Sequence, residues 1–413
     1  MVVLHSFGGG ASDGMNPYGS LIQSGPNLYG MTYYGGSSNF GTVFQIGANG
    51  AGFNVLHSFA GGPNDGGNPQ GSLIQSGAVL YGMTQFGATG PGATGPGTIF
   101  QIGTNGAGYN LLHVFTRSAT DGGYPTGSLA QSASTFYGMT PDGGNASGSV
   151  GTVFQVGADG TGFSVLHSFS QGEGYYPAGS LVQVGSSLYG MAKWGGASDK
   201  GIIFRIGTNG TGYNIIHSFT GEDGSNPLGS LTASGSTLYG MTSGGGAAGG
   251  GTVFKMATDG TGFSTLHSFV PGPNDGFSPA GSLAMAGSSL FGMTRGGGAT
   301  YVPGSPLAGG NPGDGTLFQI LTDGTGYSVL HSFTGGPNDG AVPYGDLVLS
   351  GSTFYGMTSG GGGNGLGTIF SFTPVPEPSS LLLVAAGGSL ALFARRRLTR
   401  RLRAARHAEA PAR

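Results

Sequence analysis

The sequence contains no cysteine and a single tryptophan, and only 8% of its 413 residues are charged. The absence of cysteine excludes disulfide bonds, thiolate metal sites and thiol catalysis. Residues 1–374 carry fifteen acidic and only six basic side chains. That is too few cations for the basic surface with which proteins bind nucleic acid, so we expect no nucleic-acid partner.

Glycine, by contrast, is in large excess. The chain has 92 glycines, and each costs a helix interior roughly 1 kcal/mol relative to alanine. They follow no three-residue period, which excludes a collagen helix. Hydrophobic residues make up 37% of the chain and aromatics recur at fixed places, unlike the composition of a disordered protein. This composition favours an all-β fold of short strands joined by glycine-rich turns.

Four short landmarks recur seven times along residues 1–372. The first, LHSF or a near form, has its histidine at His5, His57, His113, His167, His217, His267 and His331. The second, GSL or GDL, begins at Gly19, Gly71, Gly127, Gly179, Gly229, Gly281 and Gly345. The third, YGMT or a near form, begins at Tyr29, Tyr81, Tyr137, Tyr189, Tyr239, Phe291 and Tyr355. The fourth, GTVF or a near form, begins at Gly41, Gly97, Gly151, Gly201, Gly251, Gly315 and Gly367.

Each landmark lies in a run rich in β-branched and aromatic residues, bounded by Gly, Asn, Asp, Pro or Ser, which is typical of a strand. Four strands in each unit of 50 to 64 residues predict a seven-bladed β-propeller of four-stranded blades over residues 1–372. A β-solenoid is the alternative, although its repeats are usually shorter, at about 20–30 residues.

Turn residues predict the order of the strands within a blade. Asn-Gly or Asp-Gly pairs such as Asn49-Gly50 separate each GTVF run from the next LHSF run and favour a hairpin there. A blade then runs GSL, YGMT, GTVF, LHSF from the axis outward, and segments such as residues 61–70 cross to the next blade. The chain starts with an LHSF strand and ends its repeats with a GTIF strand. We therefore predict that the N-terminal strand pairs with the last blade and closes the ring.

The loop between YGMT and GTVF differs most between units, with insertions at residues 85–96 and 295–314. Variable loops on one rim of a rigid scaffold predict a binding surface, and neutral drift in loop length is the alternative.

The pattern changes after residue 372. Residues 373–380 form a linker that contains Val375-Pro376-Glu377-Pro378, residues 381–394 form an apolar run, and residues 395–413 are rich in arginine. The arginines next to the apolar run are Arg395, Arg396, Arg397, Arg400 and Arg401. As a helix, the apolar run would be about 21 Å long, short of the roughly 30 Å hydrocarbon core, so we expect a short transmembrane helix that inserts only marginally. The flanking arginines predict that the tail stays in the cytoplasm and the propeller lies outside.

The order of this tail resembles the PEP-CTERM sorting signal: a Pro376-Glu377-Pro378 motif, a hydrophobic helix and an arginine cluster. The repeated body resembles the GloVer tandem repeats of cyanobacterial and verrucomicrobial genomes. The resemblance implies export in a Gram-negative bacterium and passage through the inner membrane. It also implies recognition by a membrane exosortase, which removes the helix and the arginine tail near the PEP motif.

Proteins with this tail should also carry an N-terminal signal peptide. Residues 1–5 instead lead directly into the first repeat strand, without a basic region or a cleavage site. We expect either a start codon placed too late or a fragment, in preference to a cytoplasmic protein with a fortuitous tail.

The seven repeated histidines invite a metal or catalytic interpretation. Period-two alternation places His57 on the face that carries Phe53 and Phe59, the packed face of a blade. We therefore favour histidines that are hydrogen-bonded within their blades. A metal site would need several of them to converge, whereas separate blades keep them apart.

Six aspartates and one glutamate occupy the segments that cross between blades. They are Asp13, Asp65, Asp121, Glu173, Asp223, Asp275 and Asp339. Pairs such as Asn64-Asp65 offer two oxygens to calcium, but no unit has the dense acidic ladder of a calcium loop. We expect these residues to form turns, with calcium as the alternative and no other cofactor.

The YGMT tyrosines and methionines are best explained by packing between blades, with stacking on sugars as the alternative for any tyrosine that reaches a rim. Trp194, Lys193 and Lys200 form the one notable cluster outside the repeat pattern. No residues resemble a serine nucleophile elbow or the paired acids of a glycosidase. The sequence therefore predicts a non-enzymatic surface or matrix protein that binds envelope polysaccharide or another envelope component, with a secreted propeller enzyme acting on glycans as the alternative.

Overall fold

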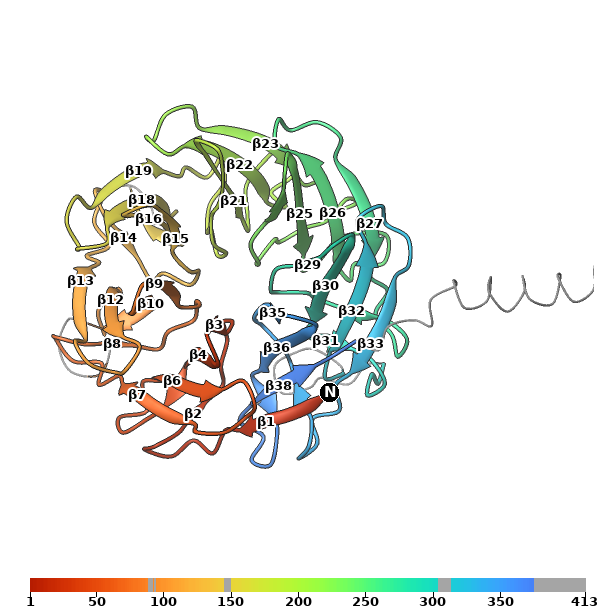
Figure 1. The fold of residues 1–413 in the computed structure, drawn as a ribbon. Helices are drawn as coiled ribbons and strands as arrows, with labels where there is room; N and C mark the ends of the chain where they lie inside the picture. The colour runs from red at the N-terminus through yellow and green to blue at the C-terminus, as the bar shows by residue number, and fades with distance from the viewer. Residues whose placement is uncertain (88–91, 93, 145–149, 304–312, 375–413) are drawn as a thin grey trace, which may run out of the picture. The chain divides into compact units, whose positions relative to one another are not determined.

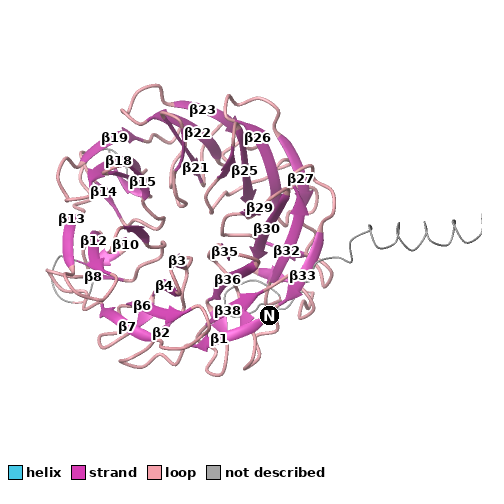
Figure 2. Cartoon of the chain, in the orientation of Figure 1, coloured by secondary structure: helices cyan, strands magenta, loops and turns pink. Residues whose placement is uncertain are grey.

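The computed structural model describes residues 1–87, 92, 94–144, 150–303 and 313–374. Seven antiparallel four-stranded sheets stand around a common axis, like the blades of a propeller (Figure 1). Figure 2 shows strands and loops and no helix in the part of the chain that is described. The prediction of an all-β, seven-bladed propeller is confirmed.

Each landmark contributes one strand to every blade. The innermost strands, next to GSL, are β3 (Ile22–Ser24), β9 (Ile74–Ser76), β15 (Ala130–Ser132), β20 (Val182–Val184), β24 (Thr232–Ser234), β29 (Ala284–Ala286) and β35 (Val348–Ser350). The YGMT strands are β4 (Asn27–Thr32), β10 (Val79–Thr84), β16 (Thr135–Thr140), β21 (Ser187–Ala192), β25 (Thr237–Thr242), β30 (Ser289–Thr294) and β36 (Thr353–Thr358). The GTVF strands are β6 (Thr42–Gly47), β12 (Thr98–Gly103), β18 (Thr152–Gly157), β22 (Ile202–Gly207), β26 (Thr252–Ala257), β32 (Thr316–Leu321) and β38 (Thr368–Phe372). The outermost strands are β7 (Asn54–Ser58), β13 (Asn110–Val114), β19 (Ser164–Ser168), β23 (Asn214–Ser218), β27 (Ser264–Ser268), β33 (Ser328–Ser332) and β1 (Val2–Ser6).

Short two-residue strands join the crossing segment to the loop after YGMT. They pair as β2 (Gly14–Met15) with β5 (Tyr34–Gly35), β8 (Gly66–Gly67) with β11 (Phe86–Gly87), β14 (Gly122–Gly123) with β17 (Asp142–Gly143), β28 (Gly276–Phe277) with β31 (Gly296–Gly297), and β34 (Gly340–Ala341) with β37 (Gly360–Gly361). Single bridges, Tyr175 to Trp194 and Ser225 to Gly244, take their place in the fourth and fifth units. These pairings fix the loop after YGMT against the crossing segment of the same unit.

The expected hairpins form at the Asn-Gly and Asp-Gly pairs. In the first, Gly50 has a φ of 84°, the Gly47 N–H donates to the Ala51 carbonyl at 2.8 Å, and the Asn49 side chain accepts from the Ala51 N–H. The segments after LHSF cross to the next sheet, as predicted, because β7 and β9 belong to neighbouring blades.

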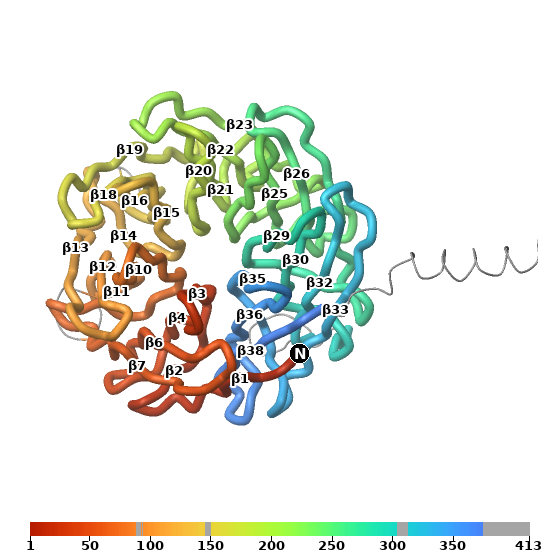
Figure 3. Tube along the Cα trace, in the orientation of Figure 1, coloured from red at the N-terminus to blue at the C-terminus, as the bar shows by residue number. Residues whose placement is uncertain are grey.

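The ring closes through its N-terminal strand. β1 pairs antiparallel with β38, and residue Val2 lies opposite Ser371. The pairing contains the same irregularity, or bulge, that separates the GTVF and LHSF strands of the other blades. Figure 3 shows the red N-terminal strand beside the blue end of the repeats. The predicted closure is confirmed.

The hydrophobic core lies between the blades. One cluster joins Tyr29, Met31 and Phe59 of the first blade to Leu80 and Phe100 of the second. The same arrangement recurs at each interface, including the one that the N-terminal strand completes with Phe7. The YGMT tyrosines are 4–9% exposed, so packing between blades accounts for them and they do not reach a rim.

A buried pair of threonines links the YGMT and GTVF strands. The Thr32 and Thr42 hydroxyls lie 2.8 Å apart, and the Thr32 hydroxyl also donates to the Tyr34 carbonyl. The fourth unit replaces both threonines together, by Ala192 and Ile202, which are both fully buried. Because both threonines are replaced together, no buried hydroxyl is left without a hydrogen-bond partner. This explains why the unit that has YGMA in place of YGMT also has GIIF in place of GTVF.

The chain divides into a compact unit, Met1–Phe372, and a second unit that begins at Thr373. The sorting-motif residues Val375 to Pro378, the predicted helix at residues 381–394 and the arginine tail lie outside the described residues. In the part of the chain that is described, no helix is long and apolar enough to cross a membrane.

Candidate functional site

Two segments of each unit lie side by side at one end of the propeller axis. The Asn-Pro-x-Gly-Ser segment, or its equivalent, enters the innermost strand there, and the YGMT strand ends beside it. In the first unit, the Tyr33 N–H donates to the Asn16 carbonyl at 3.3 Å. The same bond forms in every unit except the third, where Pro141 has no N–H to donate. The residue before the proline is left-handed in all seven units, with φ between 51° and 60°.

Three positions in these segments vary between units although the residues around them repeat. The residue before the proline is Asn16, Asn68, Tyr124, Tyr176, Asn226, Ser278 or Val342. The residue after the proline is Tyr18, Gln70, Thr126, Ala178, Leu228, Ala280 or Tyr344. The residue after YGMT is Tyr33, Gln85, Pro141, Lys193, Ser243, Arg295 or Ser359. Residues that pack between blades have the same surroundings in every unit and are therefore nearly constant. Positions that vary around the axis make the seven-fold ring chemically asymmetric.

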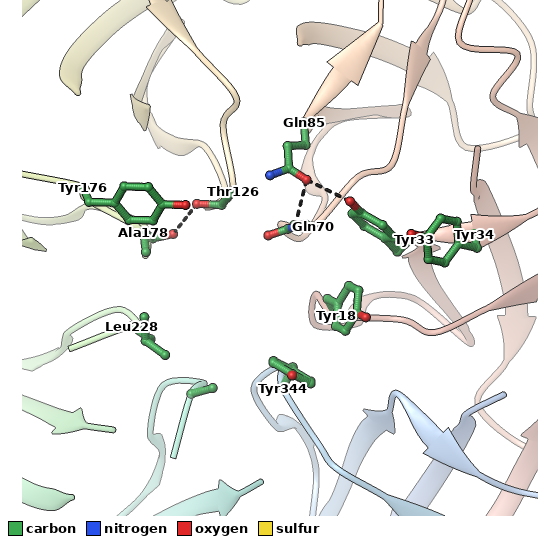
Figure 4. Close-up of a pocket in the computed structure, with 11 residues that line it drawn as sticks. Tyr18, Tyr33, Tyr34, Gln70, Gln85, Thr126, Tyr176, Ala178, Leu228 and Tyr344 are labelled. Carbon is green, nitrogen blue, oxygen red and sulfur yellow. Dashed lines mark hydrogen bonds between the residues drawn. The ribbon is translucent and has the colours of Figure 1, made fainter. Parts of the chain in front are cut away.

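A cavity of ≈ 490 Å³ opens at this end of the axis. We call it the axial cavity. All seven residues that follow the prolines line it, together with Tyr33, Tyr34, Gln85 and Tyr176 (Figure 4). A cavity that mixes aromatic and uncharged polar side chains has the character of a small-molecule or saccharide site.

Tyrosines gather on one side of the axial cavity. The Tyr18 ring lies edge to face with the rings of Tyr344 and Tyr33, at centroid distances of 4.8 and 5.2 Å, and Tyr34 contacts Tyr33 at 4.6 Å. Burial, with smaller contributions from the neighbouring tyrosines, raises the pKa of Tyr18 to about 12. Tyr18 is therefore uncharged at neutral pH, and Tyr176 faces the cluster across the opening (Figure 4).

Hydrogen bonds position polar groups beside these tyrosines. The Tyr33 hydroxyl donates to Gln85 Oε1 at 3.0 Å, and Gln70 donates to the same oxygen at 2.9 Å. On the opposite side, the Thr126 hydroxyl donates to the Ala178 carbonyl at 3.1 Å. The two glutamines thus form one fixed polar edge next to the aromatic surface (Figure 4).

Two cations contact tyrosines that line the axial cavity, although neither cation is itself among the lining residues. Lys193 Nζ lies 5.8 Å from the centre of the Tyr176 ring and 5.2 Å from that of Trp194. Arg295 Cζ lies 5.0 Å above the Tyr344 ring. The structure thus brings Lys193 and Trp194 together, as their proximity in sequence suggested. Lys200 lies near Gly221.

A ring of hydrogen bonds forms the floor of the axial cavity. The Ser20 N–H donates to the Ser72 hydroxyl oxygen of the next blade at 2.7 Å, and the pattern continues around the axis. The preceding glycine makes the close approach possible, because a Cβ on Gly19 would lie 2.2 Å from the Gly71 oxygen.

Asp346 is the exception in this ring, where the other six units have serine. It accepts from the Ser282 N–H, and its own N–H donates to the Ser20 hydroxyl oxygen at 2.7 Å. Burial raises the pKa of the Asp346 carboxyl, against the opposing effect of its hydrogen bonds with Ser282 and Ser20. The ionised form of this carboxyl is therefore less stable here than in water.

The repeated histidines lie on the outermost strand of each blade, whereas the seven residues after the prolines, which line the axial cavity, precede the innermost strands. His57 Nε2 is 3.1 Å from Asp65 Oδ1, and five of the other histidines have an equivalent aspartate: His5, His113, His217, His267 and His331. Each aspartate also accepts N–H groups of its turn, as Asp65 does from Ala60 and Gly66. Burial alone would raise the pKa of Asp65, but hydrogen bonds from His57, Tyr109 and Ala60 lower it overall.

Sequence reasoning treated these histidines and aspartates separately and missed their pairing. In five units the two residues stand eight positions apart, and this constant spacing is the signal that identifies the pair. Among the described residues, no three His, Cys, Asp or Glu side chains gather as a metal-ion site requires.

The predicted shared face of Phe53 and His57 is wrong. The His57 ring stacks on Tyr109 of the following blade at 3.9 Å, whereas Phe53 stacks on His5 of the preceding one, also at 3.9 Å. The bulge between the two strands inserts Leu56 without a partner. That extra residue breaks the alternation on which the prediction depended.

The fourth unit departs from the histidine–aspartate pattern. His167 Nε2 is 3.8 Å from Glu173 Oε2, too far for a hydrogen bond, and has no other partner among the described residues. Glu173 instead accepts from the Ser170 hydroxyl at 2.9 Å. In both the fourth and the fifth unit the acidic residue stands six positions after the histidine. In the fifth unit this residue is Asp223, which lies 2.9 Å from His217. The longer glutamate side chain therefore accounts for the lost bond.

Of the variable loops, the structure describes mainly the parts nearest the blades. Tyr33, Tyr34 and Gln85, at the start of such loops, line the axial cavity. Residues 88–91, 93 and 304–312 of the two insertions lie outside the described residues. The residues after the prolines had no place in the sequence prediction, although their variation within a constant Pro-x-Gly frame marks them.

The fold and the C-terminal signal together define a class: repeat propellers that carry a sorting motif. The Gloeobacter/Verrucomicrobia repeat matches residues 1–150 and 88–305, and the PEP-CTERM protein-sorting motif matches residues 374–397. The chain belongs to the Gloeobacter/Verrucomicrobia repeat family, as its landmarks predicted. No curated protein matches it.

Solved structures share the fold at low identity. An oligogalacturonate lyase in complex with manganese is 10% identical, with a TM-score of 0.52, and the match covers 85% of this chain and 86% of that one. A putative 6-phosphogluconolactonase from Bacteroides uniformis is 14% identical, with a TM-score of 0.51, over 85% of this chain and 93% of that one. At such identities these matches establish the propeller fold alone.

The fourth unit offers a test of the histidine–aspartate bond. We expect Glu173→Asp to give His167 the partner that His217 already has and to stabilise the fold by about 1 kcal/mol. Asp223→Glu, the reverse exchange at the matched position, should destabilise it by a similar amount. Chemical unfolding of both variants at neutral pH measures the changes. Equal stability of the Asp223→Glu variant and the native protein would contradict this role of the pair.

The serine ring offers a second test. Because burial raises the folded-state pKa of Asp346, ionisation of this carboxyl opposes folding. Asp346→Ser should therefore raise the melting temperature at pH 7, and the gain should shrink as the pH falls towards 3.8, the ordinary pKa of the group. Asp346→Asn, which removes the charge and keeps the shape, serves as the matched variant. A lower melting temperature for Asp346→Ser at pH 7 would refute the interpretation.

Proposed function

We propose that this protein is an exported cell-surface or extracellular-matrix propeller that binds envelope polysaccharide in its axial cavity without catalysing a reaction on it. The tyrosine cluster of Tyr344, Tyr18 and Tyr33 carries the proposal. These residues come from positions that packing does not fix, and they line one cavity at the axis.

The chemistry of the cavity suits a sugar ring. Aromatic faces bind the apolar C–H faces of pyranoses, while fixed polar groups bind the hydroxyls at the edge. Tyr18 and Tyr344 supply the aromatic surface, and the Gln70–Gln85 pair supplies the polar edge. An open cavity at the end of the axis also accepts an internal stretch of a long chain.

The sorting signal supports the cellular part of the proposal. The PEP-CTERM motif implies recognition by exosortase, a membrane enzyme, and export through the membrane to the cell surface. We propose that the apolar helix at residues 381–394 anchors the protein only transiently in the inner membrane and that cleavage near Pro376-Glu377-Pro378 releases the propeller. A polysaccharide of the envelope is the polymer that such a propeller meets first.

A glycan-cleaving enzyme is the alternative function. Hydrolysis of a glycosidic bond normally uses two carboxyl groups that flank the bond. No aspartate or glutamate is among the residues that line the axial cavity, and Asp346 in its floor stands alone there. This composition favours binding over cleavage.

Binding and turnover measured on one glycan panel test the proposal. We expect the purified full-length protein to bind at least one bacterial polysaccharide and to release no reducing ends from it. Tyr18→Ala and Tyr344→Ala should each weaken binding by about tenfold, because each removes an aromatic surface. Tyr18→Phe and Tyr344→Phe keep the ring and should retain most of the affinity.

Two results would contradict the proposal. Release of new reducing ends from a bound glycan would show that the protein is an enzyme. Equal affinities of the native protein and the two alanine variants would show that the glycan binds elsewhere.

A further inference from the structure

Two positively charged residues follow the YGMT strands of nearby units around the axial cavity. Lys193 and Arg295 occupy the same position, directly after the YGMT strand, in the fourth and sixth units. The fifth unit, between them, has Ser243 there. Two cations thus flank one neutral side chain along three consecutive units of the ring.

Both cations are positioned by contacts with tyrosines that line the axial cavity. Lys193 lies over Tyr176 and Arg295 lies over Tyr344, and both rings line the axial cavity. Burial, and then the positive charge of Arg295, lower the pKa of Lys193, so the two side chains influence each other across the fifth blade.

Neither cation is neutralised within the part of the chain that the structure describes. Among the described residues, the only ion pair between a lysine or arginine and a carboxylate joins Arg117 Nε to Asp142 Oδ2, at 2.7 Å. Arg295 makes its hydrogen bonds to Ser278, at 3.3 Å from Nε and 2.7 Å from Nη2. A guanidinium has five N–H donors, so this side chain is oriented by Ser278 and Tyr344 and retains donors for a ligand.

Positioned but unneutralised cations beside the tyrosines of the axial cavity suit a ligand that carries negative charge. We propose that the axial cavity binds an acidic glycan, whose carboxylate or sulfate groups contact Lys193 and Arg295 while its sugar rings stack on Tyr18 and Tyr344. The inference rests on the proposed function and names the class of polysaccharide. Among the described residues, Asp346 is the one carboxyl in the lining of the axial cavity and its floor, and its environment disfavours the ionised form that would repel such a ligand.

The repeat itself supplies substitutions that the fold accepts. Serine occupies the same position in the fifth and seventh units, as Ser243 and Ser359, so Lys193→Ser and Arg295→Ser place a native residue type in a native setting. Arg205→Gln is the matched control. It removes a cation from β22, where Arg205 lies opposite Tyr189 of β21 and Asn214 of β23, and five of the other GTVF strands have glutamine or lysine there.

Calorimetric titration of the full-length protein with three matched polymers tests the proposal: a polyuronate, the same polymer after reduction of its carboxyl groups, and a sulfated neutral glycan. We expect the polyuronate or the sulfated glycan to bind about tenfold or more tightly than the reduced polymer at low salt. Lys193→Ser and Arg295→Ser should each remove most of that difference, and Arg205→Gln should leave it unchanged. Added salt should weaken acidic-glycan binding to the native protein more than to the double serine variant.

The outcomes separate this inference from the proposed function. Preference for the polyuronate identifies a carboxylate ligand, and preference for the sulfated polymer identifies a sulfate. Equal binding of the reduced polymer, unaffected by the serine variants but weakened by Tyr18→Ala, would overturn the acidic-glycan inference and leave the proposed function standing. Absence of binding to all three polymers and to the wider glycan panel would overturn both.

Discussion

Contact between six glycine–serine pairs and one glycine–aspartate pair at the axis is the constraint on which the rest of this propeller depends. Each serine N–H donates to the side-chain oxygen of the next blade, and each glycine leaves room for the backbone beside it. The resulting ring fixes how closely the blades approach. It therefore also fixes where the residue two positions before each serine stands, and those seven residues line the axial cavity.

Each repeat unit contains residues that hold the fold and other residues that line the axial cavity. Residues that face a neighbouring blade meet the same surroundings seven times and stay nearly constant, as the buried YGMT and GTVF residues do. Where one of them changes, its partner changes with it, as Ala192 and Ile202 do in place of two threonines. Residues at the end of the axis meet solvent or ligand, and there the units differ. A symmetric fold thus obtains an asymmetric site, with a tyrosine cluster and two cations that lie over Tyr176 and Tyr344.

Sequence alone predicted the propeller, the strand order and the ring closed by the N-terminal strand, because repeated turn residues and strand patterns locate these features without any long-range contact. It did not predict the bulge at Leu56, since a bulge leaves no mark in a hydrophobic alternation, and the faces of Phe53 and His57 were misassigned as a result. It also missed the axial cavity. Alignment of the repeats draws attention to constant residues, whereas Tyr18, Gln70 and Tyr344 are informative because they differ. The sorting motif was recognised from its residues, and the match at residues 374–397 agrees with it.

The central claim is that the variable side chains at the axial cavity bind an acidic glycan while the repeated residues only hold the ring. The most direct test is a crystal structure of the full-length protein with an acidic oligosaccharide of the class that binds best. We predict sugar rings against Tyr18 and Tyr344 and an anionic group within hydrogen-bonding distance of Lys193 or Arg295. A saccharide bound to the outer strands or to the opposite end of the axis, with the axial cavity empty, would contradict the account.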